Sequence, residues 1–137
     1  MNPKLVAREL ATQLGTILNG RSTPFAPLAG NPPFGWVFNP DSTPHMSYAN
    51  GLTRLKLSVT VAVHPAAYPA VAWDLVGDFM ADTGDMSVKL CLETGPEGGY
   101  TTLDTLVVTR SIGGEVTIAD VLYKGATFDL DITGSGA

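Results

Sequence analysis

Carboxylates recur in pairs along this sequence, and paired carboxylates are residues that general acid–base catalysis uses. Asp74 and Asp78 are four residues apart in a segment with helical periodicity, so they share one helix face. Asp129 and Asp131 alternate in a strand-like segment, so they share one strand face. Both pairs fall on faces predicted to meet solvent, where no burial would raise a carboxyl pKa. We therefore expect acidic surface patches and no catalytic residues.

Other residues with reactive or metal-binding side chains are scattered. The two histidines, His45 and His64, lie in different segments, and the single cysteine, Cys91, sits between two leucines. That setting predicts a small packed thiol, and the spacing of histidine and cysteine does not fit a metal site. Gly-rich segments at 95–99 and 112–115 lack the Lys and the following helix of a phosphate-binding loop. We expect no metal, no cofactor and no enzymatic activity.

Charge and composition narrow the remaining classes of function. The chain of 137 residues has 8 Lys and Arg against 13 Asp and Glu, a net charge of −5, which argues against general binding along a nucleic-acid backbone. Charged residues make up only 15%, which leaves much uncharged surface of the kind that partners often cover. We find neither an apolar run long enough to span a membrane nor a signal peptide, so we expect no membrane association and a product assembled in a cytoplasm.

Periodicity predicts a single domain over residues 1–137, with a flexible tail at 133–137. Helices are expected over 3–19 and 69–82, and over 86–92, where a strand is the alternative. Extended segments are expected at 25–28 and 36–38, followed by a polar loop over 41–51. The strands with clear alternation or β-branched residues are 52–63, 102–109, 115–123 and 126–132, with a turn at 111–114 and a turn or bulge at 124–125.

These elements predict an α+β fold, in which two main helices pack on one face of a mainly antiparallel sheet to make two layers. In the strand at 52–63, Leu55, Leu57 and Val59 point toward the core, while Arg54 and Lys56 point the other way. The two cations have two interpretations: an exposed sheet face, or contact with an acidic neighbour such as Asp129 and Asp131 of another subunit.

Aromatic side chains gather in and beside the Pro-rich segments, where little local secondary structure is available to bury them. They are Phe25, Phe34, Trp36, Phe38 and Tyr48. Two interpretations remain open, because these rings either pack back on the domain or belong to an interface, where aromatic residues are enriched.

Several segments together resemble one family. They are the helix ending Leu-Asn-Gly (18–20), Pro-Phe-Gly-Trp-Val-Phe (33–38), the strand 54–63 feeding the helix 72–80, Ser-Val-Lys-Leu-Cys-Leu (87–92) and the closing segment 121–132. Over nearly its whole length the chain resembles tail terminator proteins of long-tailed, siphovirus-like phages of the actinobacteriophage type. The resemblance implies an α+β subunit of a hexameric ring at the head-proximal end of the virion tail.

The resemblance also implies what such a ring does. It caps the tail tube, stops polymerisation of the tube protein and forms the docking surface for the head-side connector or stopper protein, while DNA passes through the channel without specific binding. The candidate subunit or ring interface residues are Phe34, Trp36, Phe38, Tyr48, Arg54 and Lys56, and the candidate acidic channel residues are Asp129 and Asp131. The loops 21–35 and 39–51 are expected to reach neighbouring rings.

Two other classes of function remain open. One is another neck component, a head–tail stopper or a minor tail protein. The other is a small, non-enzymatic binding domain, which would need a pocket with convergent polar groups. Affinity for tail-tube subunits separates the phage roles from this last class.

Overall fold

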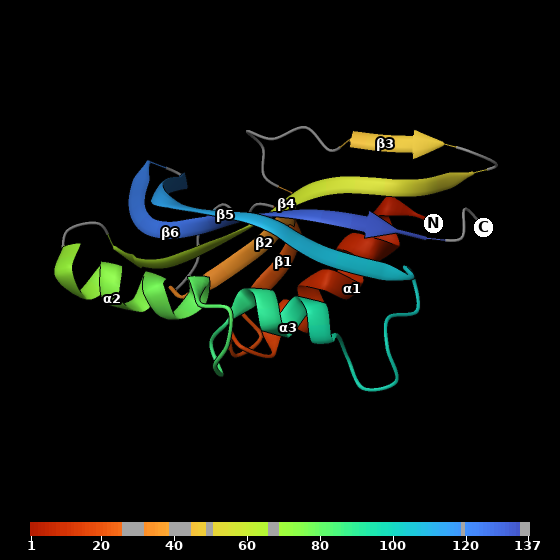
Figure 1. Ribbon diagram of the computed structural model, residues 1–137. Coiled ribbons are helices and arrows are strands. Elements are labelled where there is room, and N and C mark those ends of the chain that lie inside the picture. The colour runs from red at the N-terminus through yellow and green to blue at the C-terminus, as the bar shows by residue number, and fades with distance from the viewer. Residues whose placement is uncertain (26–31, 39–44, 49–50, 66–68, 119, 135–137) are drawn as a thin grey trace.

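Helices and strands separate into two layers in the computed structural model, which describes residues 1–25, 32–38, 45–48, 51–65, 69–118 and 120–134. Three helices in this part of the chain lie on one side of a six-stranded sheet (Figure 1). The helices are α1 (Pro3–Gly15), α2 (Pro69–Met80) and α3 (Val88–Thr94). The strands are β1 (Ser22–Phe25), β2 (Phe34–Phe38), β3 (His45–Tyr48), β4 (Leu52–Pro65), β5 (Thr105–Ile118) and β6 (Val121–Thr133). The predicted α+β fold is confirmed.

The sheet has the order β1-β2-β4-β6-β5, and β3 pairs with the beginning of β4. β1 and β2 run parallel, whereas the other described pairs are antiparallel, as expected for a mainly antiparallel sheet. β4 and β6 form the centre, with Leu57 opposite Leu130 and Val59 opposite Phe128. β5 lies at one edge of the sheet.

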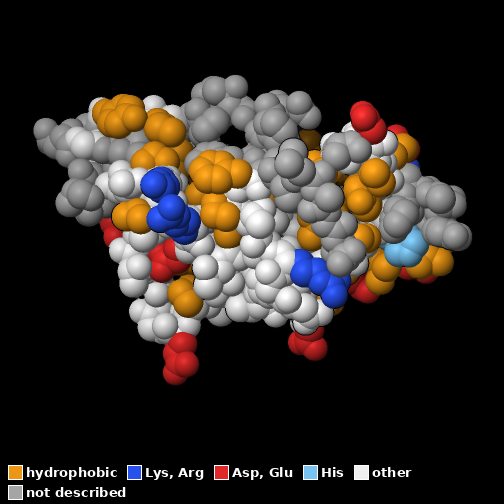
Figure 2. Space-filling view, turned by 180° about the vertical axis from the view of Figure 1, so that it is seen from behind, with side chains coloured by type: hydrophobic (Ala, Val, Ile, Leu, Met, Phe, Trp, Pro, Cys, Tyr) orange, Lys and Arg blue, Asp and Glu red, His pale blue; other side chains and the backbone are white. Residues whose placement is uncertain are grey.

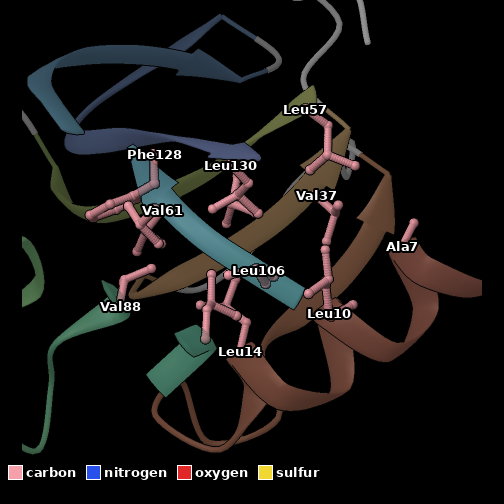
Figure 3. Close-up of a cluster of buried hydrophobic side chains, with 14 of the residues drawn as sticks. Ala7, Leu10, Leu14, Val37, Leu57, Val61, Val88, Leu106, Phe128 and Leu130 are labelled. Carbon is pink, nitrogen blue, oxygen red and sulfur yellow. The ribbon is translucent and has the colours of Figure 1, made fainter. Parts of the chain in front are cut away.

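The main core lies between the helices and the sheet. Leu10 and Leu14 of α1 point toward the sheet, where they meet side chains such as Val37 and Leu57 (Figure 3). α1 approaches β2 closely at Gly35, where an added Cβ would lie 2.9 Å from Leu14 Cδ2. The contact requires glycine because a methyl group in this packed position would overlap its neighbour.

The C-terminal third forms two long strands, where the sequence predicted three shorter ones. The expected turn at 111–114 is wrong, and the chain does not turn at 124–125, because both segments continue as strand. The pairing irregularity opposite 124–125 lies in β4, between Ala62 and His64. The glycines there serve close packing: Gly113 lies under Met80 and Trp73 of α2, and Gly125 lies against the Val61 carbonyl oxygen. The chain reverses direction between β5 and β6, beside Asp120, which has a positive φ of 66°.

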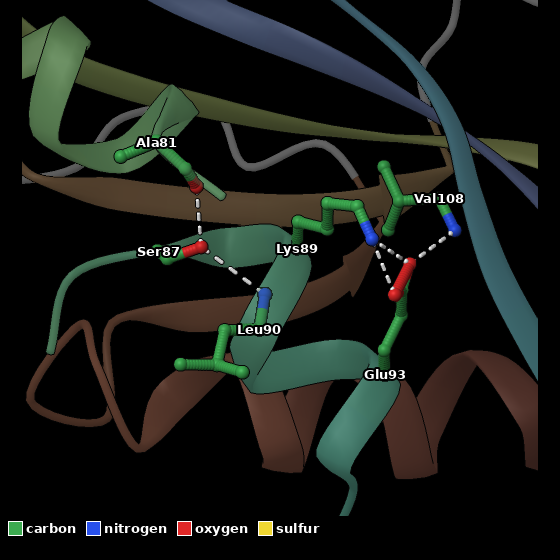
Figure 4. Close-up of polar contacts among 6 residues, drawn as sticks. All are labelled: Ala81, Ser87, Lys89, Leu90, Glu93 and Val108. Atoms are coloured by element: carbon green, nitrogen blue, oxygen red, sulfur yellow. Dashed lines mark hydrogen bonds and ion pairs between the residues drawn. The ribbon is translucent and has the colours of Figure 1, made fainter. Parts of the chain in front are cut away.

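Other boundaries also differ from expectation. α1 ends at Gly15, and 16–20 form a turn, with Asn19 and Gly20 at positive φ. β3 occupies part of the predicted loop 41–51 by pairing with β4. The segment expected as either helix or strand at 86–92 is helical from Val88, because Ser87 caps it by accepting a hydrogen bond from the Leu90 amide (Figure 4). Residues 26–28 and 135–137 lie outside the described part.

Candidate functional site

The sheet surface opposite the helices, here called the open face, collects most of the predicted charged residues. Strand alternation places Arg54, Lys56 and Ser58 of β4 on this surface, because Leu55 and Leu57 between them face the helices. Asp129 and Asp131 of β6 lie on it for the same reason. The predicted division of these two strands into core and polar faces is therefore confirmed.

Asp131 forms a two-pronged ion pair with Arg54 on the open face. Arg54 Nε donates to Asp131 Oδ1 at 3.0 Å, and Arg54 Nη2 donates to Oδ2 at 2.6 Å. The hydrogen bond from Arg54 is the main cause that lowers the pKa of Asp131, with partial burial opposing it and the nearby charges of Arg54 and Lys56 adding to it. Asp131 therefore stays ionised across the neutral range.

Asp129 is held by two partners. Arg110 Nε donates to its Oδ2 at 3.0 Å, and Ser58 Oγ donates to Oδ1 at 3.0 Å. A register irregularity between Val108 and Arg110 brings Arg110 opposite Asp129. Sequence reasoning missed Arg110 because it ended the strand at Thr109. The signal for Arg110 would have been recognition that 105–118 is one strand containing a bulge.

These contacts correct two expectations about charge. Arg54 meets the carboxylate of its own chain, so pairing with Asp131 of another subunit is not needed to explain it. Asp129 and Asp131 are each neutralised by an arginine, so the open face is not the bare acidic wall that was expected of a DNA channel. Lys56 is exposed and forms no ion pair with the described residues.

Two of the predicted interface aromatics belong to a second core. Phe34 is 4% exposed and Trp36 is 1% exposed, and they cluster with Ala62, Ile118 and Tyr123. They lie on the side of the sheet away from the helices, because Gly35 and Val37 between them pack toward α1. The Phe34 ring meets the Tyr123 ring edge to face at 5.5 Å. Their placement as accessible interface residues is therefore wrong, because pairing of β2 with β4 puts them beside Ala62, and the β5–β6 hairpin supplies Ile118 and Tyr123.

The other predicted aromatics differ from these two. Tyr48 is 70% exposed on β3, where its hydroxyl donates to Met46 Sδ at 3.4 Å. Tyr48 therefore remains a candidate contact residue. Phe38 ends β2, and its side chain lies outside the described part of the structure. The proposed loops 21–35 and 39–51 also lie partly outside it.

Exposed hydrophobic side chains occur on several separate elements, and sequence reasoning did not single them out. They include Val71, Trp73 and Leu75 on α2, Val107 and Ile112 on β5, and Val121 and Leu122 at the start of β6. Figure 2, which views the molecule from behind, shows hydrophobic side chains in several groups beside Lys and Arg side chains. On α2, only Ala72, Val76 and Phe79 of the described side chains are buried, and Leu75 is 38% exposed.

The remaining reactive groups have structural partners. Cys91 belongs to α3, and its thiol donates to the Gln13 carbonyl oxygen of α1 at 3.3 Å. Burial raises the pKa of the thiol. The described residues contain no group of three or more His, Cys, Asp or Glu placed to hold a metal ion. No helix in the described ranges is both long and apolar enough to cross a membrane.

Two shallow hollows on the described surface are small, at about 210 and 220 Å³. One of about 220 Å³ is lined by Met80, Lys89, Phe128 and the bulged part of β5, below the range of about 300–1,000 Å³ usual for ligand pockets. Its only charged side chains, Lys89 and Arg110, are already engaged with Glu93 and Asp129.

Comparison with known protein families found no family model that matches the chain, and comparison with curated proteins found no match.

Proposed function

We propose that this chain is a virion structural protein, the tail terminator subunit of a long-tailed phage, and not an enzyme. The observation that carries the proposal is the spread of exposed hydrophobic side chains over surfaces on different elements. Val71 and Leu75 project from α2, Val107 and Ile112 from β5, and Tyr48 from β3. In an assembly, partner subunits would cover exposed apolar groups of this kind.

A terminator ring requires several contact surfaces on each subunit. Each subunit has a neighbour on either side in the ring, a tail tube below and a head-side connector above. Contacts of this heterologous kind close into a ring when the rotation between neighbours is suitable. The separate apolar groups on α2, β3, β5 and β6 supply enough distinct surfaces for such a subunit.

The electrostatics of the chain are compatible with passage of DNA. The net charge of −5 disfavours tight binding to phosphates. On the open face, Arg54 and Arg110 form ion pairs with Asp131 and Asp129, so they are not free to bind a DNA backbone. DNA could thus pass through the proposed hexameric channel without specific binding.

The mechanism is steric. The ring would cover the last layer of tube subunits with a surface that does not accept another tube subunit, and its other side would bind the connector. The subunit would assemble in the host cytoplasm and remain at the head-proximal end of the tail.

The test is direct observation of assembly. The purified chain is examined by light scattering and negative-stain microscopy, alone and with the tail-tube protein of the same phage. Rings that cap tube ends and prevent their extension would support the proposal. A chain that neither caps tubes nor changes their length would overturn it, and binding to the connector alone would favour another neck component.

A further inference from the structure

The outward faces of α1 and α2 carry opposite charges. On α1, Lys4 and Arg8 are exposed one helical turn apart, and Leu5 beside them is 45% exposed. We call Lys4, Leu5 and Arg8 the basic ridge. The acid of the same helix, Glu9, is engaged by Thr101 and Thr102, so it does not neutralise this ridge.

The matching surface on α2 is acidic. Asp74 and Asp78 are exposed one turn apart, and neither forms an ion pair with another described residue. Val71, 53% exposed, and Leu75, 38% exposed, form a row beside them. We call Val71, Asp74, Leu75 and Asp78 the acidic ridge. It is the face of α2 turned away from its buried residues Ala72 and Val76.

The two ridges have the same spacing. Residues four apart on a helix are separated by about 6 Å along its axis. When α1 and α2 run antiparallel, Lys4 therefore falls opposite Asp78 and Arg8 opposite Asp74. Leu5 of α1 then lies against Val71 and Leu75 of α2. Opposite charges and hydrophobic side chains are therefore paired across the same two helices.

The ridges of one chain belong to separate parts of the helix layer. α3 lies between α1 and α2 and packs against both (Figure 1). The two ridges are thus available to two different neighbouring copies. Contact between unlike patches of identical subunits is heterologous, which produces closed rings or open filaments.

We propose that the basic ridge of one subunit binds the acidic ridge of the next, and that this helix pair is the repeated contact between copies of the chain. That subunits joined by this contact close into a ring, and do not extend into a filament, rests on the proposed function. The partner is a second copy of this chain, and the contact needs no ligand.

Charge reversal tests the contact. In Lys4→Glu/Arg8→Glu both ridges are acidic, and in Asp74→Lys/Asp78→Lys both are basic. Sedimentation velocity over a range of concentrations should show self-association at least about tenfold weaker in each variant, because like charges then face each other. Mixing the two variants should restore association, because every contact then pairs opposite charges. Glu97→Lys, a reversal at an exposed acid outside the ridges, should associate like the unmodified protein.

The outcomes separate this inference from the proposed function. Restoration on mixing also shows that both variants are folded, and circular dichroism checks this independently. The inference is overturned if the unmodified chain stays monomeric throughout, if reversal leaves association unchanged, or if mixing does not restore it. Tube capping is scored separately: rings that cap tubes but ignore charge reversal overturn only this contact, whereas charge-dependent rings that ignore tubes overturn only the terminator proposal.

Discussion

Arg54 and Asp131 lie 77 residues apart in the sequence and form a two-pronged ion pair across the centre of the sheet. Arg110 and Asp129 form a second pair beside it, with Nη2 and Oδ2 2.9 Å apart. Each arginine thus has a carboxylate of its own chain. This internal neutralisation, more than the net charge of the whole chain, determines what the open face offers to a polyanion.

Removing both carboxylate charges should create a DNA-binding surface. In Asp129→Asn/Asp131→Asn, Arg54 and Arg110 lose their ion-pair partners beside Lys56, which has none among the described residues. We expect affinity for short duplex DNA at about 50 mM salt to rise at least about tenfold and to fall steeply as salt is added. Fluorescence anisotropy measures this affinity at each salt concentration. The control Glu97→Gln/Asp120→Asn changes net charge equally at sites away from the arginines, and an equal gain there would refute the local explanation.

Glu9 should make the fold sensitive to acid. Its carboxylate accepts hydrogen bonds from the Thr101 amide at 3.0 Å and the Thr102 hydroxyl at 2.6 Å. Partial burial raises the pKa of Glu9, but the bonds from Thr102 and Thr101 outweigh burial and lower it from 4.5. Because the folded state has the lower pKa, this stabilisation is present above pH 4.5 and is lost as pH falls through the folded value.

The variant Glu9→Gln tests that interaction. We expect it to lower the free energy of unfolding by about 1–3 kcal/mol at pH 7, because two amides and two hydroxyls lose a charged acceptor. Urea denaturation at pH 7 and below pH 4.5 should show the difference from the unmodified protein shrinking in acid. Glu97→Gln, at an exposed position of the nearby loop, is the matched control. A difference that stays constant with pH would contradict this role for Glu9.

Glu93 should protect a backbone amide of the edge strand β5 from hydrogen exchange. Its carboxylate accepts the Val108 amide of edge strand β5 at 3.0 Å and also binds Lys89 (Figure 4). Glu93→Ala should therefore raise hydrogen exchange of the Val108 amide at least about tenfold, since the edge amide loses its acceptor. Lys89→Ala removes the ion pair but leaves the amide bond, so its effect should be smaller. Equal exchange of the Val108 amide in both variants would show that its bond to Glu93 is not what protects it.

Alanine substitutions at Trp36 and Tyr48 should distinguish a core side chain from a contact side chain. Trp36→Ala leaves a cavity in the second core and should cost about 3–5 kcal/mol of folding stability, measured by denaturation. Tyr48→Ala removes an exposed ring and should change stability by less than about 0.5 kcal/mol. If the proposed function holds, Tyr48→Ala weakens assembly with the tube or the ring while the monomer stays folded. A stable Trp36→Ala monomer would contradict the burial of that ring.

The features that could be predicted from the sequence were those that depend on residues close together in the chain. Alternation in 52–63 correctly predicted that Leu55 and Leu57 face the core while Arg54 and Lys56 do not. The helical periodicity of 3–19 was equally visible, and with that of 69–82 and the alternating strands it predicted the α+β class. These features depend on periods of two and 3.6 residues, so a single sequence carries them.

Contacts between distant segments were decided only in the tertiary structure. Gly113 and Gly125 fell in segments predicted as a turn and as a turn or bulge, but they lie inside long strands. Gly113 packs tightly under Met80 and Trp73 of α2, and at Gly125 the Val61 carbonyl of β4 is too close for a side chain. Phe34 and Trp36 looked exposed until β2 paired with β4 and the β5–β6 hairpin supplied Ile118 and Tyr123. Asp131 looked like free acid until strand register brought Arg54 to it. Local composition cannot distinguish a glycine in a turn from one under a helix, because the deciding neighbour is remote in the chain.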